Sequence, residues 1–340
     1  MRPTTKDLAK AAGVSLATVD RVLNERPNVS ARTVKKVQDA IERIGFVRNI
    51  AAVNLARNRT YRFRFVLPEK GDQYLKELLR EVAAANAALK PDLVSVDVAQ
   101  VAIEDPHAVA NYLSSLEAGA VDGVAVMAPE SPQARDAMSR LCERGIKVVQ
   151  FLSGQENLEK LDFVGVDNVA AGATAGRIMG RFSAGRAGKI LIVAETILSQ
   201  DSIKRRLGFD RVINRCFPGL RSLPTLETHS DLERAARIVK TAFDHNPDIV
   251  GVYVVSPEAR VPLEAIARFA DLKKFVVVAH ERTPFSEQAL REERVDAIIA
   301  QNPGHAVRSA IRILRARADH LEPVAAQERI RIEILLAENL

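Results

Sequence analysis

Apolar and polar positions follow two different patterns along the chain, and the change between them falls near residue 60. In residues 4–45, apolar side chains recur at helical spacing, and a hydroxyl residue precedes each apolar segment where a helix cap is expected. Gly45 follows the last segment, where a residue that tolerates left-handed dihedrals ends a helix. The pattern predicts three short helices: Thr4 to about Ala12, Ser15 to about Leu23, and Ser30 to Gly45.

From about Phe63 the pattern changes to short apolar runs that alternate with amphipathic segments. Runs such as FRFVLP, KILIVAE and KFVVVAHE are almost continuously apolar, which is typical of strands buried on both faces of a parallel sheet. About ten such strands exceed a comfortable single sheet, so two lobes are expected. The predicted fold is an all-α headpiece followed by an α/β core of two Rossmann-like parallel-sheet lobes.

The net charge of +6 is unevenly distributed, and this changes the picture. Residues 1–60 hold twelve Lys and Arg against five Asp and Glu, so the whole positive excess lies there. A basic module on a near-neutral body predicts a polyanion partner for the module, whereas a solubilising tail would lack its ordered apolar pattern. No long apolar run and no secretory signal are present, and the two cysteines are isolated. We therefore expect a cytoplasmic protein without a disulfide framework, metal site or cofactor.

The second predicted helix has an inner and an outer face. At 100° per residue, Val19, Val22 and Leu23 point toward the other helices, whereas Asp20 and Arg21 point outward. Two helices joined by a glycine turn, with such a face on the second, indicate a DNA-binding helix-turn-helix; a protein-binding three-helix bundle is the alternative. The residues expected at DNA are Thr4, Ser15, Leu16, Ala17, Thr18, Asp20, Arg21, Asn24, Ser30 and Thr33.

Asp20 is the unusual member of this outer face, because DNA phosphates repel its charge. Its carboxylate could accept a hydrogen bond from a cytosine amine and so read a base. The alternative is an edge position at which Asp20 faces solvent or a cation such as Arg26. The sequence leaves these two interpretations open.

The stretch TTKDLAKAAGVSLATVDRVLN, with VSARTVKKVQDAIERIGF after it, closely resembles the DNA-binding headpiece of the lactose-repressor (LacI/GalR) family. The resemblance implies a headpiece at 1–48, a hinge at 49–61, and a core at 62–340 like the type I periplasmic sugar-binding proteins. It implies lobe 1 at about 62–165 and 293–322, and lobe 2 at about 166–292 and 323–340. It also implies a homodimer on a pseudo-palindromic operator, with Asn49 capping a hinge helix and Leu55 entering the minor groove.

The same resemblance implies a ligand between the two lobes, at the carboxyl ends of the strands. The ligand-binding residues that it indicates are Asp72, Tyr74, Asp167, Arg205, Ser256, Glu281 and Gln301. Asp167 could instead cap a helix, and Leu152 and Ser153 replace an Asp-Arg pair that sugar-binding relatives often carry. The expected effector is a sugar, polyol or sugar acid, with a purine left open.

These features predict a sequence-specific transcription regulator, with repression as the expected sense of control. The sequence leaves open whether the effector induces or co-represses. A two-domain α/β enzyme is the first alternative, but no phosphate loop, nucleophile elbow or metal-ligand spacing is found. An exported solute-binding protein would need a signal peptide, and a non-specific DNA-binding protein would lack preference for an operator.

Overall fold

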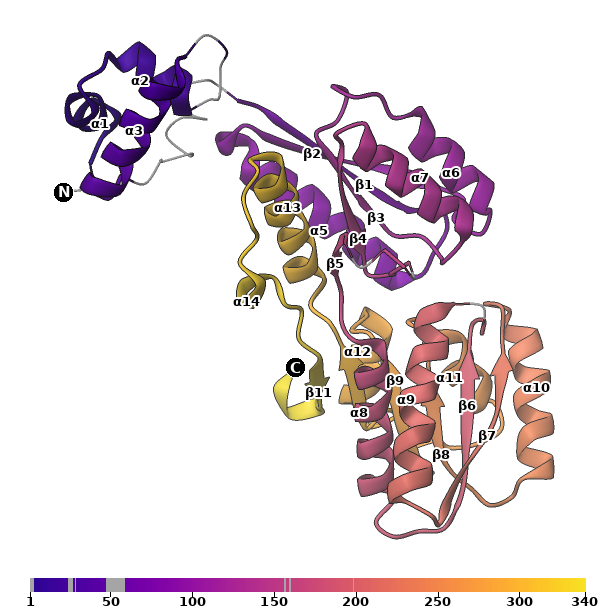
Figure 1. The fold of residues 1–340 in the computed structure, drawn as a ribbon. Coiled ribbons are helices and arrows are strands. Elements are labelled where there is room, and N and C mark those ends of the chain that lie inside the picture. The colour runs from indigo at the N-terminus through magenta and orange to yellow at the C-terminus, as the bar shows by residue number, and fades with distance from the viewer. Residues whose placement is uncertain are drawn as a thin grey trace. The chain divides into compact units, whose positions relative to one another are not determined.

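The computed structural model describes residues 3–23, 27, 29–46, 59–155, 157–158, 160–197 and 199–340. The chain divides into two compact units, Met1–Arg59 and Thr60–Leu340, and each is described by itself. Figure 1 draws both as ribbons. No helix in the described residues is long and apolar enough to cross a membrane.

The described part of the first unit contains three helices where the sequence predicts them: α1 (Thr5–Ala12), α2 (Leu16–Leu23) and α3 (Ala31–Ile44). Thr4 and Asp7 form a capping box before α1, and Ser30 caps α3 by accepting a hydrogen bond from the Thr33 amide at 3.2 Å. Gly45 ends α3 with φ of 60°, the left-handed conformation expected there. The buried residues of this small core are Leu8, Ala9, Val19, Val37, Ala40 and Phe46.

The second unit begins with a five-stranded parallel sheet in the order β2-β1-β3-β4-β5. Its strands are β1 (Tyr61–Pro68), β2 (Val94–Val101), β3 (Gly123–Val126), β4 (Lys147–Phe151) and β5 (Asp162–Val164). Helices α5 (Gln73–Leu89) and α13 (Pro303–Ala318) pack on one face, and α6 (Pro106–Ser115) and α7 (Pro132–Glu143) on the other. Helices on both faces explain the continuous apolar runs.

The second sheet has six strands in the order β11-β10-β9-β8-β6-β7, all parallel to their neighbours except β11. These are β6 (Gly188–Ala194), β7 (Leu220–Glu227), β8 (Ile249–Val254), β9 (Val276–His280), β10 (Ala297–Ala300) and β11 (Glu333–Leu335). Helices α8 (Asn168–Phe182) and α9 (Gln200–Cys216) cover one face. The other face carries α10 (Leu232–His245), α11 (Arg260–Ala267) and α12 (Pro284–Arg291). The remaining pieces are single turns at Lys90–Asp92, Leu272–Lys274, Ala325–Glu328 (α14) and Ala337–Asn339.

The chain passes back from the second lobe to the first at a later residue than the sequence predicts. Residues 293–302 were expected in lobe 1, but β10 pairs with β9, with Ile299 opposite His280, and so belongs to the second sheet. The chain returns to the first lobe after β10, through α13, and Ile330, which was expected in lobe 2, also lies in the core of the first lobe. Short strands of similar apolar character do not reveal which sheet they join, because pairing depends on distant partners.

Candidate DNA interface and ligand site

The predicted faces of α2 are confirmed by burial. Val19 is fully buried in the three-helix core, with Val22 and Leu23 packed beside it. Leu16 is 47% exposed, and Ala17, Asp20 and Arg21 are also exposed. The outer face therefore presents a guanidinium, a carboxylate and small apolar groups, which are the chemical types that read base edges.

The hydroxyl residues of this unit serve first as helix caps. Ser15 accepts a hydrogen bond from the Thr18 amide at 3.1 Å, and the two hydroxyl oxygens lie 2.8 Å apart. Ser30 and Thr33 repeat this arrangement at the start of α3. Their contact with DNA stays a prediction. The predicted DNA residues Asn24, Asn49 and Leu55 lie outside the described residues.

In the core, three of the predicted ligand residues form one buried network around Arg205. The Arg205 guanidinium donates to the Glu281 carboxylate at 2.7 Å, and both side chains are nearly inaccessible to solvent. It also donates to the Asn168 side chain at 2.8 Å and to the Val255 carbonyl at 3.1 Å. Gln301 donates its side-chain amide to Glu281 at 3.2 Å. The Arg205 cation thus joins the ends of α8, β8 and β9, and Glu281 joins the end of β10 to them.

Close packing of α8 against α9 brings Arg205 to this position. A Cβ added to Gly172 would lie 1.8 Å from the Arg205 carbonyl oxygen, and one added to Gly208 would lie 1.9 Å from the Val169 carbonyl oxygen. Only glycine allows the two backbones to approach this closely. This glycine pair was not among the residues predicted from the sequence, although the small residues repeated along 168–176 signal close packing.

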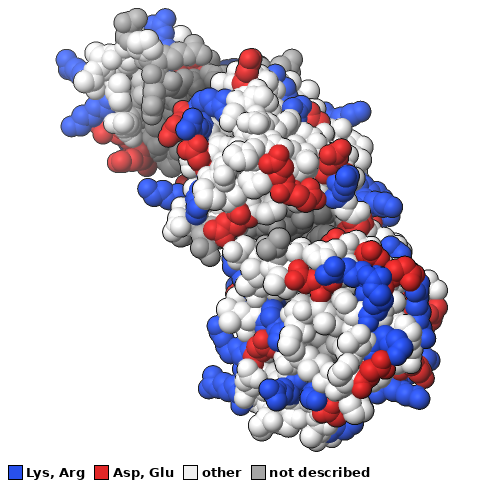
Figure 2. All heavy atoms as spheres, turned by 90° about the vertical axis from the view of Figure 1, so that its right-hand side faces the viewer, with Lys and Arg blue, Asp and Glu red and all other residues white. Residues whose placement is uncertain are grey.

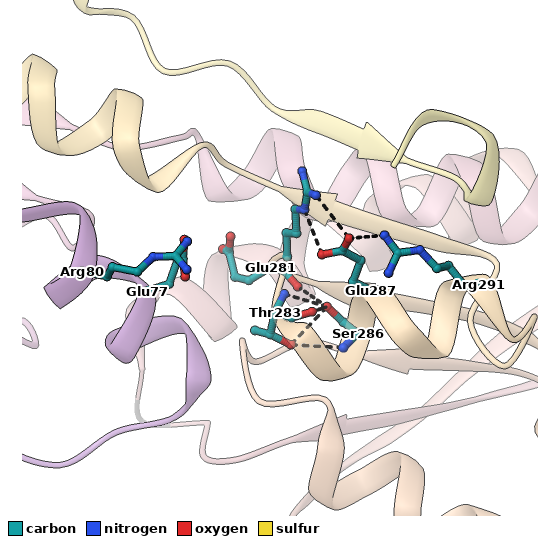
Figure 3. A network of polar contacts seen from close by, with 8 residues as sticks. Glu77, Arg80, Glu281, Thr283, Ser286, Glu287 and Arg291 are labelled. Atoms are coloured by element: carbon teal, nitrogen blue, oxygen red, sulfur yellow. Dashed lines mark hydrogen bonds and ion pairs between the residues drawn. The ribbon is translucent and has the colours of Figure 1, made fainter. Parts of the chain in front are cut away.

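A strained turn after β9 fixes Glu281. Its φ is +60°, which costs free energy for a residue with a side chain and is retained where surrounding contacts hold it. The Ser286 hydroxyl donates to the Glu281 carbonyl at 2.9 Å and, with Thr283, forms a capping box at the start of α12. Figure 3 shows these contacts on one side of the turn, with the Glu281 carboxylate pointing away from them.

Two buried polar atoms of the site have no hydrogen-bond partner among the described residues: the Tyr74 hydroxyl and the Gln301 Oε1 atom. Tyr74 is 4% exposed and Gln301 is 5% exposed. Burial raises the pKa of Tyr74 well above its ordinary value, and the nearby charge of Glu281 raises it further. Because an unpaired buried polar group costs about 1–3 kcal/mol, these two atoms are where a ligand would gain most from forming hydrogen bonds.

Asp201 belongs to the same site, although the sequence analysis did not select it. Its carboxylate accepts hydrogen bonds from the Ser153 hydroxyl at 3.1 Å and from the side-chain amide of Asn168 at 3.0 Å. Ser153 follows β4 in the first lobe, so this contact joins the two lobes. Burial raises the pKa of Asp201, whereas the charge of Arg205 lowers it. Its place four residues before Arg205 on a helix was the available signal.

The remaining predicted ligand residues are engaged in local contacts. Asp167 is exposed and caps α8 by accepting from the Val169 and Ala170 amides, as its alternative interpretation proposed. Ser256 is buried, and its hydroxyl accepts from the Glu195 amide at 3.0 Å. Asp72 caps α5 by accepting from the Leu75 amide at 3.0 Å. Asp167 and Ser256 therefore shape the site through the backbone.

His280, beside Glu281, is a packed residue of the second sheet. Burial lowers its pKa well below the ordinary value, and the nearby Arg205 charge lowers it further, so the ring is neutral. Its Nε2 atom lies 2.7 Å from the Tyr253 hydroxyl. Among the described residues, no group of three or more His, Cys, Asp or Glu could hold a metal ion.

Comparison with known proteins identifies the class. Residues 63–322 match the family model described as periplasmic binding protein domain, and residues 4–49 match the one described as bacterial regulatory proteins, lacI family. The chain therefore belongs to the periplasmic binding protein domain family over most of its length, and it carries a lacI-family regulatory domain at residues 4–49.

Curated relatives agree with this membership. The chain is 28% identical over 180 residues to the HTH-type transcriptional regulator DegA of Bacillus subtilis, covering 52% of this chain and 51% of DegA. It is 33% identical over 170 residues to the HTH-type transcriptional regulator RegA of Clostridium saccharobutylicum, covering 50% of this chain and 49% of RegA. The chain thus matches about half the length of these relatives.

Solved structures share the fold of the core. GanP, a glucose-galactose binding protein from Geobacillus stearothermophilus, aligns with a TM-score of 0.71 at 18% identity, over 83% of this chain and 99% of its own. A periplasmic solute binding protein from Actinobacillus succinogenes with bound D-allose aligns with a TM-score of 0.72 at 16% identity, over 82% and 99%. At these identities the likeness concerns the fold alone.

Proposed function

We propose that this protein is a transcription regulator that binds a specific DNA site through its headpiece and responds to a small ligand held between its lobes. The observation that carries the proposal is the exposed outer face of α2, with Arg21 at its centre, on a capped three-helix unit. That unit precedes a core with unpartnered buried polar atoms at its strand ends. A three-helix DNA-binding unit and a two-lobed ligand-binding core are each common alone. Their presence in one chain supports control of DNA binding by a ligand.

The charge distribution supports a division of labour between the two units. Figure 2 shows Lys and Arg intermixed with Asp and Glu over the core on the face that it presents. The positive excess lies instead in residues 1–60. A locally basic unit concentrates phosphate contacts there, while the balanced core adds little non-specific attraction for DNA.

The finer organisation is part of the same proposal. We assign residues 1–48 to the headpiece and 49–61 to a hinge, and we propose that a homodimer binds a pseudo-palindromic site. The effector of this proposal is carbohydrate-like, and the core binds it without catalysing a reaction. The names of the curated relatives, which are transcriptional regulators, support this assignment.

The test is selection of DNA fragments by the full-length protein, followed by affinity measurement at about 150 mM salt, where non-specific binding is weak. Arg21→Ala should lose about 1–3 kcal/mol of discrimination at one base pair. Lys36→Ala, a charge-matched control on the exposed surface of α3, should change the affinity for all sequences equally. Equal affinity for selected and scrambled DNA would overturn the proposal.

A further inference from the structure

Three carboxylates outside the Arg205 network follow the carboxyl ends of core strands. Asp72 follows β1, Glu195 follows β6, and Glu258 follows β8. The hydrogen bond from the Glu195 amide to Ser256 holds the ends of β6 and β8 side by side. Gln73, next to Asp72, accepts a hydrogen bond from the Phe285 amide of the second lobe at 3.1 Å. Asp72, from the first lobe, therefore lies close to the strand ends of the second.

The negative charges of this group act on one another. Burial raises the pKa of Asp72, and the charge of Glu195 raises it further. Burial also raises the pKa of Glu258, with further increases from Asp72 and Glu195. The backbone amides of Leu75 and Arg260, which donate to Asp72 and Glu258, oppose these shifts only in part.

Two arginines near these carboxylates, Arg260 and Arg205, already have other partners. The Arg260 guanidinium, which attracts Glu258 at a distance, forms an ion pair with Glu264 at 3.6 Å. All three guanidinium nitrogens of Arg205 donate to protein oxygens: those of Asn168, Val255 and Glu281. The site therefore has an excess of negative charge, and its buried cation is already paired.

The unpartnered atoms of the site point to the same kind of ligand. The Gln301 Oε1 atom can only accept a hydrogen bond, and the Tyr74 hydroxyl can donate or accept one. With the surrounding carboxylates, the site offers many acceptors and few donors. A ligand rich in hydrogen-bond donors is complementary to it, and a ligand carboxylate would be repelled.

We propose that the effector is a small polyhydroxylated amine whose ammonium group lies among Asp72, Glu195 and Glu258 and whose hydroxyls reach Tyr74 and Gln301. The inference rests on the proposed function, since it uses the same ligand site. It departs from the sugar acid that the sequence left open. A neutral sugar would satisfy the acceptors but would leave the repulsion among the carboxylates. The described residues offer no metal-ligand cluster, which favours an organic cation over a metal ion.

The experiment measures binding of matched probes to the full-length protein by calorimetry and thermal shift. The panel contains D-glucosamine, D-galactosamine, D-mannosamine and 1-amino-1-deoxy-D-sorbitol. Each probe is compared with its neutral hydroxyl analogue and its N-acetyl form, and each hexosamine also with the corresponding uronate. At least one amine should bind about tenfold or more tightly than its neutral analogue, and the difference should shrink as salt is raised.

Variants assign the effect to the three carboxylates. Asp72→Asn keeps a residue that can cap α5, and it should remove most of the preference for the amine. Glu195→Gln and Glu258→Gln should do the same without loss of the unliganded melting temperature. Glu233→Gln, at an exposed ion pair with Arg268 on α10, is the control and should leave the preference unchanged.

The outcomes separate this inference from the proposed function. A neutral sugar or uronate that binds as tightly as its amine would overturn the amine while leaving a ligand-controlled regulator intact. Stabilisation by Mg²⁺ or Ca²⁺ alone, or no response to any amine, would also overturn it. The regulator proposal is judged separately, by selective DNA binding of the same protein without any probe.

Discussion

Replacing Arg205 with Met tests how the buried network holds the core together. Arg205→Met keeps a long side chain but removes the charge and three hydrogen bonds, to Asn168, Val255 and Glu281. It leaves the buried carboxylate of Glu281 and the partly buried carboxylate of Asp201 without their common cation. Removing one partner of a buried ion pair costs about 3–5 kcal/mol, because the other charge stays buried and unpaired.

The reverse substitution should cost less. In Glu281→Gln the amide oxygen can still accept from Arg205, and Asp201 still attracts the guanidinium. The loss is then the difference between a charged and a neutral hydrogen bond, about 1–2 kcal/mol. Arg206→Met is the matched control on the same helix. Its partly exposed ion pair with Asp210 and its hydrogen bond to Thr225 should together contribute about 1 kcal/mol.

The cost of Arg205→Met should also depend on pH. Burial already raises the pKa of Glu281, and loss of the neighbouring cation raises it further. A carboxyl whose pKa is higher in the folded state binds more protons folded than unfolded, so the free energy of unfolding falls as pH rises. The free energy of unfolding falls over the pH range between the ordinary pKa of a Glu carboxyl and the raised pKa of Glu281. Its slope there is at most about 1.4 kcal/mol per pH unit for one proton. The variant should be closest to the parent near pH 5 and furthest from it near pH 8.

Far-ultraviolet circular dichroism is the suitable assay, because the chain has no Trp for fluorescence. Melting curves of the parent and the three variants at pH 5 and pH 8 give the order of stabilities and its pH dependence. The reasoning fails if Glu281→Gln destabilises more than Arg205→Met, or if Arg205→Met and Arg206→Met have the same effect. A pH-independent loss in Arg205→Met would refute the role of carboxyl protonation.

Three further predictions follow from packing and from the headpiece. Gly172→Ala and Gly208→Ala should lower the melting temperature more than Gly176→Ala, because the Cβ added to Gly176 would lie 3.0 Å from its nearest atom and the other two would lie below 2 Å from theirs. Equal losses in the three variants would contradict the close packing of α8 against α9. Leu8→Ala, in the small headpiece core, should cost about 2–5 kcal/mol and abolish DNA binding while the core unit melts unchanged; retained DNA affinity would contradict it. Asp20→Ser should relax preference at one base pair if the carboxylate reads a base, whereas a uniform gain in affinity for all sequences would show that it only repels phosphates.

The headpiece could be predicted closely from the sequence because its determinants are local. Thr4 and Ser30 lie next to the amides that they cap, and Gly45 ends a helix through its own dihedral angles. The inner and outer faces of α2 depend only on helical spacing, so the burial of Val19 and the exposure of Arg21 could be predicted from the sequence. The hinge residues Asn49 and Leu55, by contrast, lie outside the described residues, so their roles stay predictions.

The ligand site was predictable in part, and the limit has a physical cause. Residues at the ends of parallel strands converge, so Glu281 and Gln301 could be chosen from the pattern. Their bonding to each other and to Arg205 depends on how closely α8 approaches α9, which two glycines on different helices decide together. Strand pairing has the same non-local character, and for this reason β10 was assigned to the wrong lobe.

The position of the network suggests why it suits a sensor. Asn168 begins α8 directly after the chain leaves the first lobe, and Gln301 directly precedes the return through α13. Both contact the Arg205–Glu281 pair, and Ser153 of the first lobe contacts Asp201 beside it. A ligand that satisfies the Gln301 oxygen therefore acts on groups at two of the three places where the chain crosses between the lobes. Since an effector shifts a conformational equilibrium only through contacts that differ between states, these crossing contacts are where such a difference would arise.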